Sequence, residues 1–348
     1  MRNNILIVGL VLSVVSCGIT PSDISPVNKT SLAYTLAAKK YFVNFDQLPR
    51  SSISPDNRKT YAKVELGHRL FYDTQLSLEG KNSCNSCHNL ATYGVDNKAT
   101  STGDAGENGD RNSPTVLNAS LHATQFWDGR AKDVEEQAGM PILNPVEMAI
   151  PSKEFLITRL KNIPSYVKAF EEAYPEEKTP LNYRNLEKAI GLFERELLTP
   201  SRFDDFLAGN DNALNLQEKK GFLTFNLIGC VSCHSGAVLG GQQLQKFGLF
   251  EEYASLTRSQ RVDFGKFESS GQKNDKFIFK VPSLRNIEKT APYFHDGSVQ
   301  SLEEAIQIMA KTQLGKTLSS SEVENVAAFL SSLTGKVPEK YAVAPHVY

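Results

Sequence analysis

The sequence has no cysteine to spare for a disulfide bond. It contains five cysteines, and four of them belong to two Cys-x-x-Cys-His motifs, Cys84–His88 and Cys230–His234. The fifth, Cys17, lies in an N-terminal leader. No cysteine remains for a disulfide framework or a catalytic thiol, so core packing and the groups bound by the two motifs have to hold the fold.

Charge of one sign and long apolar runs are also lacking. Lys and Arg number 38 against 39 Asp and Glu, a formal net charge of -1, so the overall charge gives no reason to expect a nucleic-acid partner. The apolar run from Ile5 to Val15 is too short to span a bilayer comfortably and has the length of a signal-peptide core. The composition, 40% apolar and 22% charged, is that of an ordinary globular protein.

The N-terminal apolar run ends in a cysteine. Residues 13–17, Ser-Val-Val-Ser-Cys, resemble a bacterial lipobox, in which the cysteine becomes the lipidated first residue of the mature protein. A plain secretory signal cleaved nearby is the alternative. We therefore predict a signal peptide over residues 1–16, a flexible tether over 17–29, and a periplasmic protein whose only membrane attachment is a lipid on Cys17.

The two Cys-x-x-Cys-His motifs carry the chemistry of the chain. In such a motif the thiols form thioethers to the haem vinyl groups, and the histidine is the proximal iron ligand. A thioredoxin-like redox pair has no need of the adjacent histidine, and a zinc site needs two more ligands at compatible spacing. We therefore predict two covalently bound haem c groups, on Cys84, Cys87 and His88 and on Cys230, Cys233 and His234.

Helical periodicity dominates the rest of the chain. Apolar residues at i, i+3 and i+4 spacing predict a helix over 183–198 that Pro200 closes. No long period-2 alternation is present, and the stretches 91–120 and 235–300 read as irregular. Capping boxes predict three further helix starts, at Asn215 with Glu218, Ser301 with Glu304 and Ser321 with Glu324.

The expected fold is mainly α, with two cytochrome c-like haem domains and long irregular loops. Two motifs in one chain indicate an internal duplication with one haem in each domain. The natural break lies near Pro200, so we assign the N-terminal haem domain to residues 30–199 and the C-terminal one to 200–348. The segment 30–50 could pack on either domain.

The ligand in the sixth position of each haem decides its function. A strong second ligand makes an electron carrier, whereas an open position admits peroxide or another small ligand. Met309 is the best candidate for the second haem, because it lies on the apolar face of a capped helix downstream of His234. An ordinary core methionine is the alternative.

Several motifs in the same order make the chain similar to the bacterial dihaem cytochrome c peroxidases. They are Leu66-Gly67, Leu70–Asp73, Ser83–Leu90, Gly94–Asn97, Arg111–Asn118, Gln125–Arg130, Val281–Asn286 and Thr290–His295. The resemblance implies a cytochrome-c peroxidase, an oxidoreductase that reduces hydrogen peroxide to water. It also implies a homodimer and a small electron-donor protein, either a c-type cytochrome or a cupredoxin.

The resemblance assigns roles to individual residues. His88 becomes the proximal ligand of a low-potential peroxidatic haem, and His234 with Met309 the ligands of a high-potential haem that accepts electrons. Glu147 matches the distal acid/base of the family, and Gln137 its polar companion. Without the resemblance, Glu147 would be interpreted as a solvated surface residue.

Other positions match the region between the two haems. Trp127 matches the aromatic residue that lies between them; by itself it reads as a core anchor. His295 matches a position near the haem interface rather than an axial ligand. Asn112, Thr290 and Pro292 match an interdomain calcium site, to which Thr290 and Pro292 contribute backbone carbonyls.

The chain departs from the family at one position. Many members block the oxidised peroxidatic haem with a histidine from the loop after the first motif. Here Asp104 occupies that position, and residues 89–121 contain no histidine. We therefore expect a sixth position that is open, or holds only water, in the oxidised protein, and activity without prior reduction. His122 is the one nearby histidine that could replace the missing ligand.

Two alternative functions are weighed against the peroxidase. A dihaem electron carrier or peroxide sensor needs strong ligands on both haems, which the missing loop histidine disfavours. A related dihaem enzyme that oxidises a protein side chain carries tyrosine in place of the methionine ligand, which Met309 disfavours.

Overall fold

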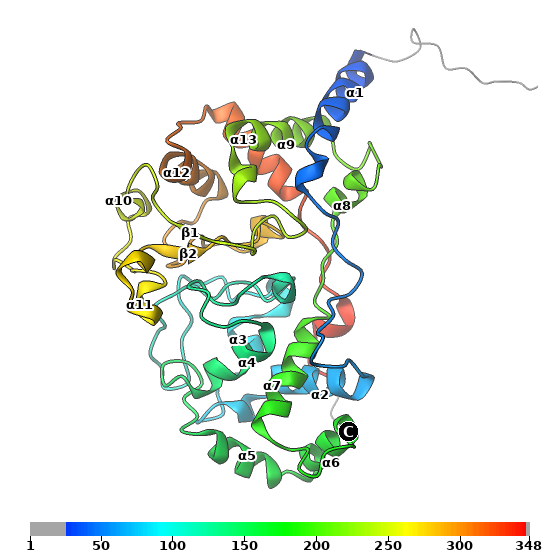
Figure 1. The fold of residues 1–348 in the computed structure, drawn as a ribbon, viewed down its shortest axis with the longest axis vertical. Coiled ribbons are helices and arrows are strands. Elements are labelled where there is room, and N and C mark those ends of the chain that lie inside the picture. The colour runs from blue at the N-terminus through cyan, green and yellow to red at the C-terminus, as the bar shows by residue number, and fades with distance from the viewer. Residues whose placement is uncertain (1–25, 346–348) are drawn as a thin grey trace, which may run out of the picture.

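Two helical lobes, stacked along the long axis of the molecule, make up the computed structural model, which describes residues 26–345 (Figure 1). The lobe drawn below contains α2 (Tyr61–Tyr72), α3 (Cys84–Cys87), α4 (Val134–Leu143), α5 (Lys153–Lys161), α6 (Pro164–Ala173) and α7 (Tyr183–Glu194). The helices drawn above are α1 (Pro26–Lys39), α8 (Arg202–Leu207), α9 (Leu216–Ile228), α10 (Tyr253–Thr257), α11 (Phe267–Ser270), α12 (Leu302–Leu314) and α13 (Ser320–Ser331). The mainly α fold is confirmed.

Strands contribute little. β1 (Leu244–Lys246) and β2 (Ile278–Lys280) form one antiparallel pair, with Leu244 opposite Lys280 and Lys246 opposite Ile278. In Figure 1 this pair lies at the inner side of the upper lobe, facing the lower one. It therefore places the end of β2 close to where the lobes meet.

The predicted helix starts are confirmed in part. At α9, Asn215 and Glu218 form the predicted capping box. At α12, Ser301 accepts the hydrogen bond from the Glu304 N–H, but its own hydroxyl donates to Glu303. The first of these starts opens the helix that leads into the second haem motif, and the other opens the helix that carries Met309.

The predicted box at Ser321 is wrong by two residues. The cap of α13 is Ser319, which donates from both its N–H and its hydroxyl to the Glu322 carboxylate. Three consecutive serines offered alternative caps, and only Ser319 has a glutamate three residues ahead that folds back on it. The predicted helix over 183–198 also ends early, at Glu194, because the N–H of Leu197 donates to the Glu194 carbonyl three residues back and the chain turns.

The N-terminal predictions lie mostly outside the described residues. Residues 1–16 and Cys17 are among those outside. The tether predicted over 17–29 is wrong at its end, because α1 begins at Pro26. Proline is favoured in the first turn of a helix, and α1 packs on α9. Among the described residues, no helix is both long and apolar enough to cross a bilayer.

Each lobe is built on one pair of crossing helices that touch at a glycine. A Cβ atom on Gly67 of α2 would lie 1.9 Å from the carbonyl oxygen of Ala189 in α7. A Cβ atom on Gly221 of α9 would lie 1.7 Å from the carbonyl oxygen of Asn325 in α13. Only glycine permits these backbone contacts, and their recurrence shows the duplication in three dimensions.

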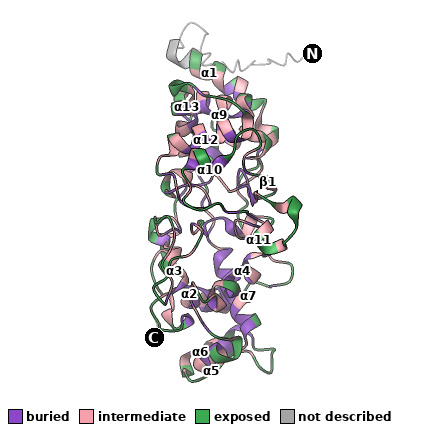
Figure 2. Cartoon of the chain, turned by 90° about the vertical axis from the view of Figure 1, so that its left-hand side faces the viewer, coloured by how far each residue is buried: buried purple, intermediate pink, exposed green. Residues whose placement is uncertain are grey.

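Buried residues concentrate inside each lobe in Figure 2. Each of the two main hydrophobic clusters also includes residues from the terminal segment at the opposite end of the chain. Ala38 and Phe45 pack into the cluster of α8, α9 and α13, whereas Tyr341 packs into the cluster of α2 and α7. The segment 30–50, for which packing on either domain is open from the sequence, contributes these two residues to the core of the second lobe. The division near Pro200 stays a prediction.

A buried ion pair inside the second lobe joins α8 to the segment that follows β2. The fully buried Arg285 guanidinium donates to both carboxylate oxygens of Asp204, at 2.7 and 2.8 Å. The carboxylate also accepts from the backbone N–H groups of Leu48 and Ser201, each at 2.7 Å. Burial raises the pKa of Asp204, but these hydrogen bonds and the arginine charge outweigh it and hold the pKa below its usual range.

We expect Asp204→Ala to lower the free energy of unfolding by about 3–5 kcal/mol, because it leaves a buried arginine charge unpaired. The contribution should be present above the unfolded-state pKa of about 3.9 and be lost as pH falls through the lower folded-state value. Urea unfolding between pH 3 and 7 measures the loss of unfolding free energy and its dependence on pH. The control Asp211→Ala removes an exposed pair with Lys39 and should cost less than about 1 kcal/mol; equal losses would contradict the assignment.

Candidate functional site

One largely apolar cavity of about 420 Å³ gathers most of the predicted site residues. It lies against the second motif and reaches residues of the first lobe. Cofactor sites typically measure about 300–1,000 Å³ and have mainly apolar walls with few polar groups. The predicted residues that line it are Cys230, Cys233, His234, Met309, Trp127, His295, Asn112, Thr290 and Pro292.

The residues of this cavity suit a c-type haem. The Nδ1 of His234 lies 3.1 Å from the Leu239 carbonyl, which can only accept, so Nδ1 carries the proton and Nε2 is left free to bind a metal. Burial lowers the pKa of His234 to about 4, so the ring is neutral, as an iron ligand must be. Met309 packs against the aromatic cluster of Phe247, Tyr253 and Phe279. Phe247 and Phe279 line the same cavity as Met309.

The first motif forms one short helical turn. Ser83 and Ser86 cap α3, and the backbone N–H of His88 donates to the Cys84 carbonyl. The Nδ1 atom of His88 is buried without a hydrogen-bond partner among the described residues, and burial lowers the pKa of the ring. Cys84, Cys87 and His88 are thus brought together by a four-residue helix, with a neutral imidazole at its end.

Glu147 is held in a tight turn after α4. Asn144 ends that helix, and its Nδ2 donates to the Glu147 carboxylate at 2.9 Å. Burial raises the pKa of Glu147, against the opposing effects of Asn144 and the Arg130 charge. Gln137 lies half-buried on α4, and no hydrogen bond in the described part of the chain joins it to Glu147. Glu147 is therefore a partly buried acid rather than a solvated one.

The loop that carries Asp104 is bound to the same turn. The Asp104 N–H donates to the Glu147 carbonyl at 2.7 Å, and a Cβ atom on Gly103 would lie 1.9 Å from the Val146 carbonyl oxygen. The buried Asp104 carboxylate accepts from the backbone N–H groups of Glu79 and Lys81. Burial raises the pKa of Asp104, but these hydrogen bonds outweigh it and keep the pKa low. The side chain in the gating position is thus an ionised anchor for residues 79–81.

Trp127 and His295 occupy equivalent places in two copies of one turn. Residues 125–131 and 293–299 each close with a backbone hydrogen bond, Gln125 to Ala131 at 2.7 Å and Tyr293 to Val299 at 2.6 Å. The rings of Trp127 and His295 meet edge to face with centroids 6.4 Å apart. The duplication therefore brings one aromatic residue from each half to the junction.

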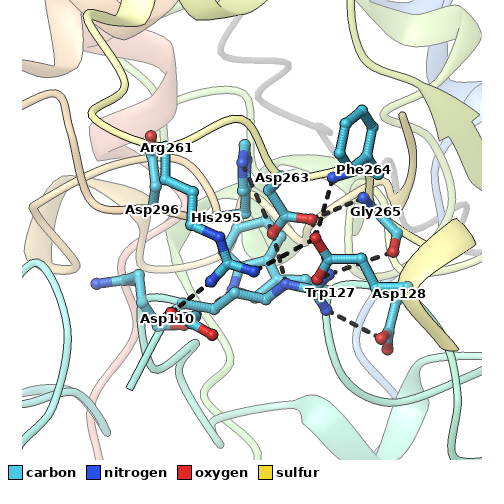
Figure 3. A network of polar contacts seen from close by, with 12 residues as sticks. Asp110, Trp127, Asp128, Arg261, Asp263, Phe264, Gly265, His295 and Asp296 are labelled. Carbon is cyan, nitrogen blue, oxygen red and sulfur yellow. Dashed lines mark hydrogen bonds and ion pairs between the residues drawn. The ribbon is translucent and has the colours of Figure 1, made fainter. Parts of the chain in front are cut away.

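An acidic and basic network surrounds this junction, as Figure 3 shows for Trp127, Asp128, Asp263 and His295. Arg111 donates to Asp263 at 2.6 and 2.9 Å and to Asp128 at 2.9 Å, which ties the first lobe to residues of the second. Sequence reasoning assigned Arg111 no role beyond its place in a motif. Its partner lies 152 residues away, so no local pattern signals the contact.

Sequence reasoning also missed a buried lysine. Lys280, at the end of β2, is 6% exposed, and its ammonium lies 3.4 Å from His122 Nδ1. Lysine is usually solvated, so nothing in the sequence singled it out. His122 lines the cavity of the second motif and contacts Lys280, which does not favour it as a replacement ligand at His88.

The chain is similar to known di-haem enzymes. The family model for di-haem cytochrome c peroxidase matches residues 61–212. Cytochrome c551 peroxidase of Pseudomonas aeruginosa is 46% identical over 284 residues, which cover 81% of each chain, and that of Nitrosomonas europaea is 42% identical over 84% of each. The solved structure of a MauG-like protein associated with microbial copper homeostasis has a TM-score of 0.74 and 29% identity, over 86% of this chain and 96% of the other.

Proposed function

Since the chain belongs to the di-haem cytochrome c peroxidase family, whose members are oxidoreductases acting on hydrogen peroxide, we propose that it reduces peroxide at the first motif with electrons received at the second. Family membership implies two haem c groups. Cys84, Cys87 and His88 would hold one and Cys230, Cys233, His234 and Met309 the other. When bound, haem c supplies the iron at which the oxygen–oxygen bond breaks and the path by which electrons arrive.

The observation that carries this proposal is the environment of Glu147. Reduction of hydrogen peroxide consumes two electrons and two protons and gives two waters, so a group must move a proton between the two oxygens. Glu147 accepts a proton from one oxygen and delivers it to the leaving one, and its raised pKa brings it closer to working pH. Asn144 holds the carboxylate in place, and Gln137 orients the substrate from α4.

The second motif is proposed as the electron-accepting end. A Met309 ligand raises the potential of its haem, which favours electron transfer from a small donor, a c-type cytochrome or a cupredoxin. Trp127 lines the same cavity and belongs to the first lobe, which supports the proposal that it couples the two haems. The N-terminal peroxidatic domain (30–199) and the C-terminal electron-transfer domain (200–348) divide these roles.

Calcium is proposed between the lobes. The side-chain Nδ2 of Asn112 donates to the Lys98 carbonyl at 2.8 Å, and its backbone carbonyl accepts from Trp127. None of the described hydrogen bonds ends on its side-chain Oδ1 atom. Thr290 and Pro292 line the same cavity as Asn112, and their backbone carbonyls would be the further ligands. Three oxygen donors of this kind suit a hard cation. A periplasmic location with a lipid on Cys17, and a homodimer, stay predictions from the sequence.

We expect the fully oxidised protein to react with peroxide without prior reduction. Asp104 offers no imidazole, and its carboxylate already accepts from the backbone N–H groups of Glu79 and Lys81. The sixth position of a haem at the first motif would therefore be open or hold only water. Stopped-flow mixing of peroxide with oxidised and half-reduced protein, followed in the Soret band, measures this directly. Similar rate constants for both forms are the expected result.

Two other outcomes are informative. Reaction of the half-reduced form alone would show that another ligand blocks the oxidised site. Reaction of neither form would contradict the peroxidase and favour a carrier. Electron paramagnetic resonance of the oxidised protein gives an independent check, since a high-spin signal should accompany the low-spin haem.

A further inference from the structure

The cavity of the second motif has one positively charged wall residue. Among the described residues that line it, Lys280 is the only lysine or arginine, and none is an aspartate or glutamate. A c-type haem carries two propionate carboxylates, and burying an anion is costly unless a positive partner meets it. Lys280 is therefore the cavity's one candidate for that partner.

Among residues 26–345, none forms an ion pair with Lys280. Its Nζ donates to the Thr124 carbonyl at 3.2 Å and approaches His122 Nδ1, and both of these acceptors are neutral. The pKa of Lys280 is lowered to about 8 by burial, and Asp128 only partly offsets this. The Asp128 carboxylate is bound by Arg111 and Arg130 instead. An ammonium has three donors, so one is left for a carboxylate that no described residue supplies.

The internal duplication relates Lys280 to a residue in the first half of the chain. Lys280 and Asn112 are equivalent in the two halves, since each stands two residues before the proline of its motif, Pro282 or Pro114. The N–H of Lys280 donates to the Trp127 carbonyl at 2.6 Å, and that of Asn112 donates to the His295 carbonyl at 2.7 Å.

The equivalence continues along both segments. Asn118 and Asn286 both have φ of 61°, and both donate to the Thr199 hydroxyl, at 2.8 and 2.9 Å. Asn112 is one of the three residues proposed to bind calcium between the lobes. Lys280, at the equivalent position of the second half, is itself a cation.

We propose that the Lys280 ammonium binds a propionate of the haem held at Cys230 and Cys233, as a positioning residue that raises the potential of that haem. The proposal rests on the ligand set proposed above, His234 with Met309. A fixed positive charge favours the reduced haem, which carries one more electron than the oxidised haem. Lys280 would thereby add to the effect of the methionine ligand in making this haem the electron acceptor.

The test is the midpoint potential of the Met-ligated haem in the whole holoprotein, measured by spectroelectrochemistry at fixed pH. Lys280→Met should lower the equilibrium constant for reduction at least about tenfold, which is about 59 mV for a one-electron couple. Lys280→Arg keeps the charge and should change it much less. Lys246→Met, on the exposed neighbouring strand, removes a solvated charge and should leave the potential as in the wild type.

An unchanged potential in Lys280→Met with intact methionine ligation would overturn the proposal. If Lys280→Met loses its native spectrum, Lys280→Gln is judged by the same criterion. If Lys280→Met and Lys280→Gln both lose the native spectrum while Lys280→Arg keeps it, the haem site requires the positive charge, which supports the proposal. If all three variants lose the native spectrum, Lys280 has a packing role, which contradicts the proposal. A wild-type spectrum without methionine ligation would refute the proposed ligand set by itself, whatever the lysine variants show.

Discussion

Glu147→Gln should lower kcat for peroxide reduction by about 10²–10⁴-fold, the usual contribution of a positioned acid/base. Glutamine is nearly isosteric and can still accept the hydrogen bond from Asn144, so the variant removes the ionisable group and little else. Haem content, both haem potentials and the free energy of unfolding should stay close to those of the wild type. Steady-state oxidation of a reduced c-type cytochrome by peroxide measures the loss.

The pH profile separates a proton-transfer role from a structural one. Burial raises the pKa of Glu147, and the carboxylate is the form that accepts the first proton from peroxide. Wild-type turnover should therefore fall as pH decreases through this raised pKa, and the acidic limb should be absent from Glu147→Gln. Glu107→Gln, an exposed residue of the Asp104 loop, serves as the matched control and should leave the profile unchanged. A Glu147→Gln enzyme with wild-type turnover would refute the assignment.

Met309→Leu should separate electron supply from peroxide chemistry. Leucine conserves volume and apolar character, so the packing against Phe247 and Tyr253 should survive at a cost below about 1.5 kcal/mol. The sulfur ligand is lost, and the potential of the second haem should fall by a sizeable part of the roughly 0.8 V that axial ligands span. Turnover with a donor cytochrome should drop at least about tenfold, equivalent to about 1.4 kcal/mol in the barrier.

The peroxide reaction at the first motif should be preserved in the same variant. Stopped-flow mixing of Met309→Leu with peroxide should give the wild-type rate in the first phase, because Glu147 and His88 are untouched. Met140→Leu, a half-exposed methionine on α4, controls for the change of residue type. An unaltered potential in Met309→Leu would show that Met309 is an ordinary core methionine, the alternative interpretation of the sequence.

The two variants fail in different ways, which makes them a joint test of the division of labour. Loss of Glu147 leaves an enzyme that accepts electrons but does not use them. Loss of Met309 leaves one that reacts with peroxide but is not re-reduced. Equal and identical defects would indicate that the two haems do not act in sequence.

Much of the chemistry was predictable because it depends on short, contiguous spacing. The thioether attachment needs two cysteines and a histidine within five residues, so both haem sites could be read from Cys84–His88 and Cys230–His234. The helix caps at Asn215 and Ser301 are equally local. Three consecutive serines, Ser319 to Ser321, are each a possible cap for α13. The prediction chose Ser321 and was wrong by two residues, because the packing of the helix selects Ser319.

The sequence by itself determined the two haem motifs, the mainly helical fold and the family, since these depend on residues near one another in the chain. The tertiary structure alone decided which residues are buried and what they contact. Asp104 is an anchor because residues 79–81, about 25 positions earlier, turn their N–H groups toward it.

Lys280 shows the same principle over a longer distance. It is buried because His122, 158 residues away, and the rest of the cavity close over it. Such contacts depend on how loops from both halves meet at the junction, which no local spacing records. The result is a buried ammonium with no anionic partner among the described residues, a feature that no sequence pattern predicts.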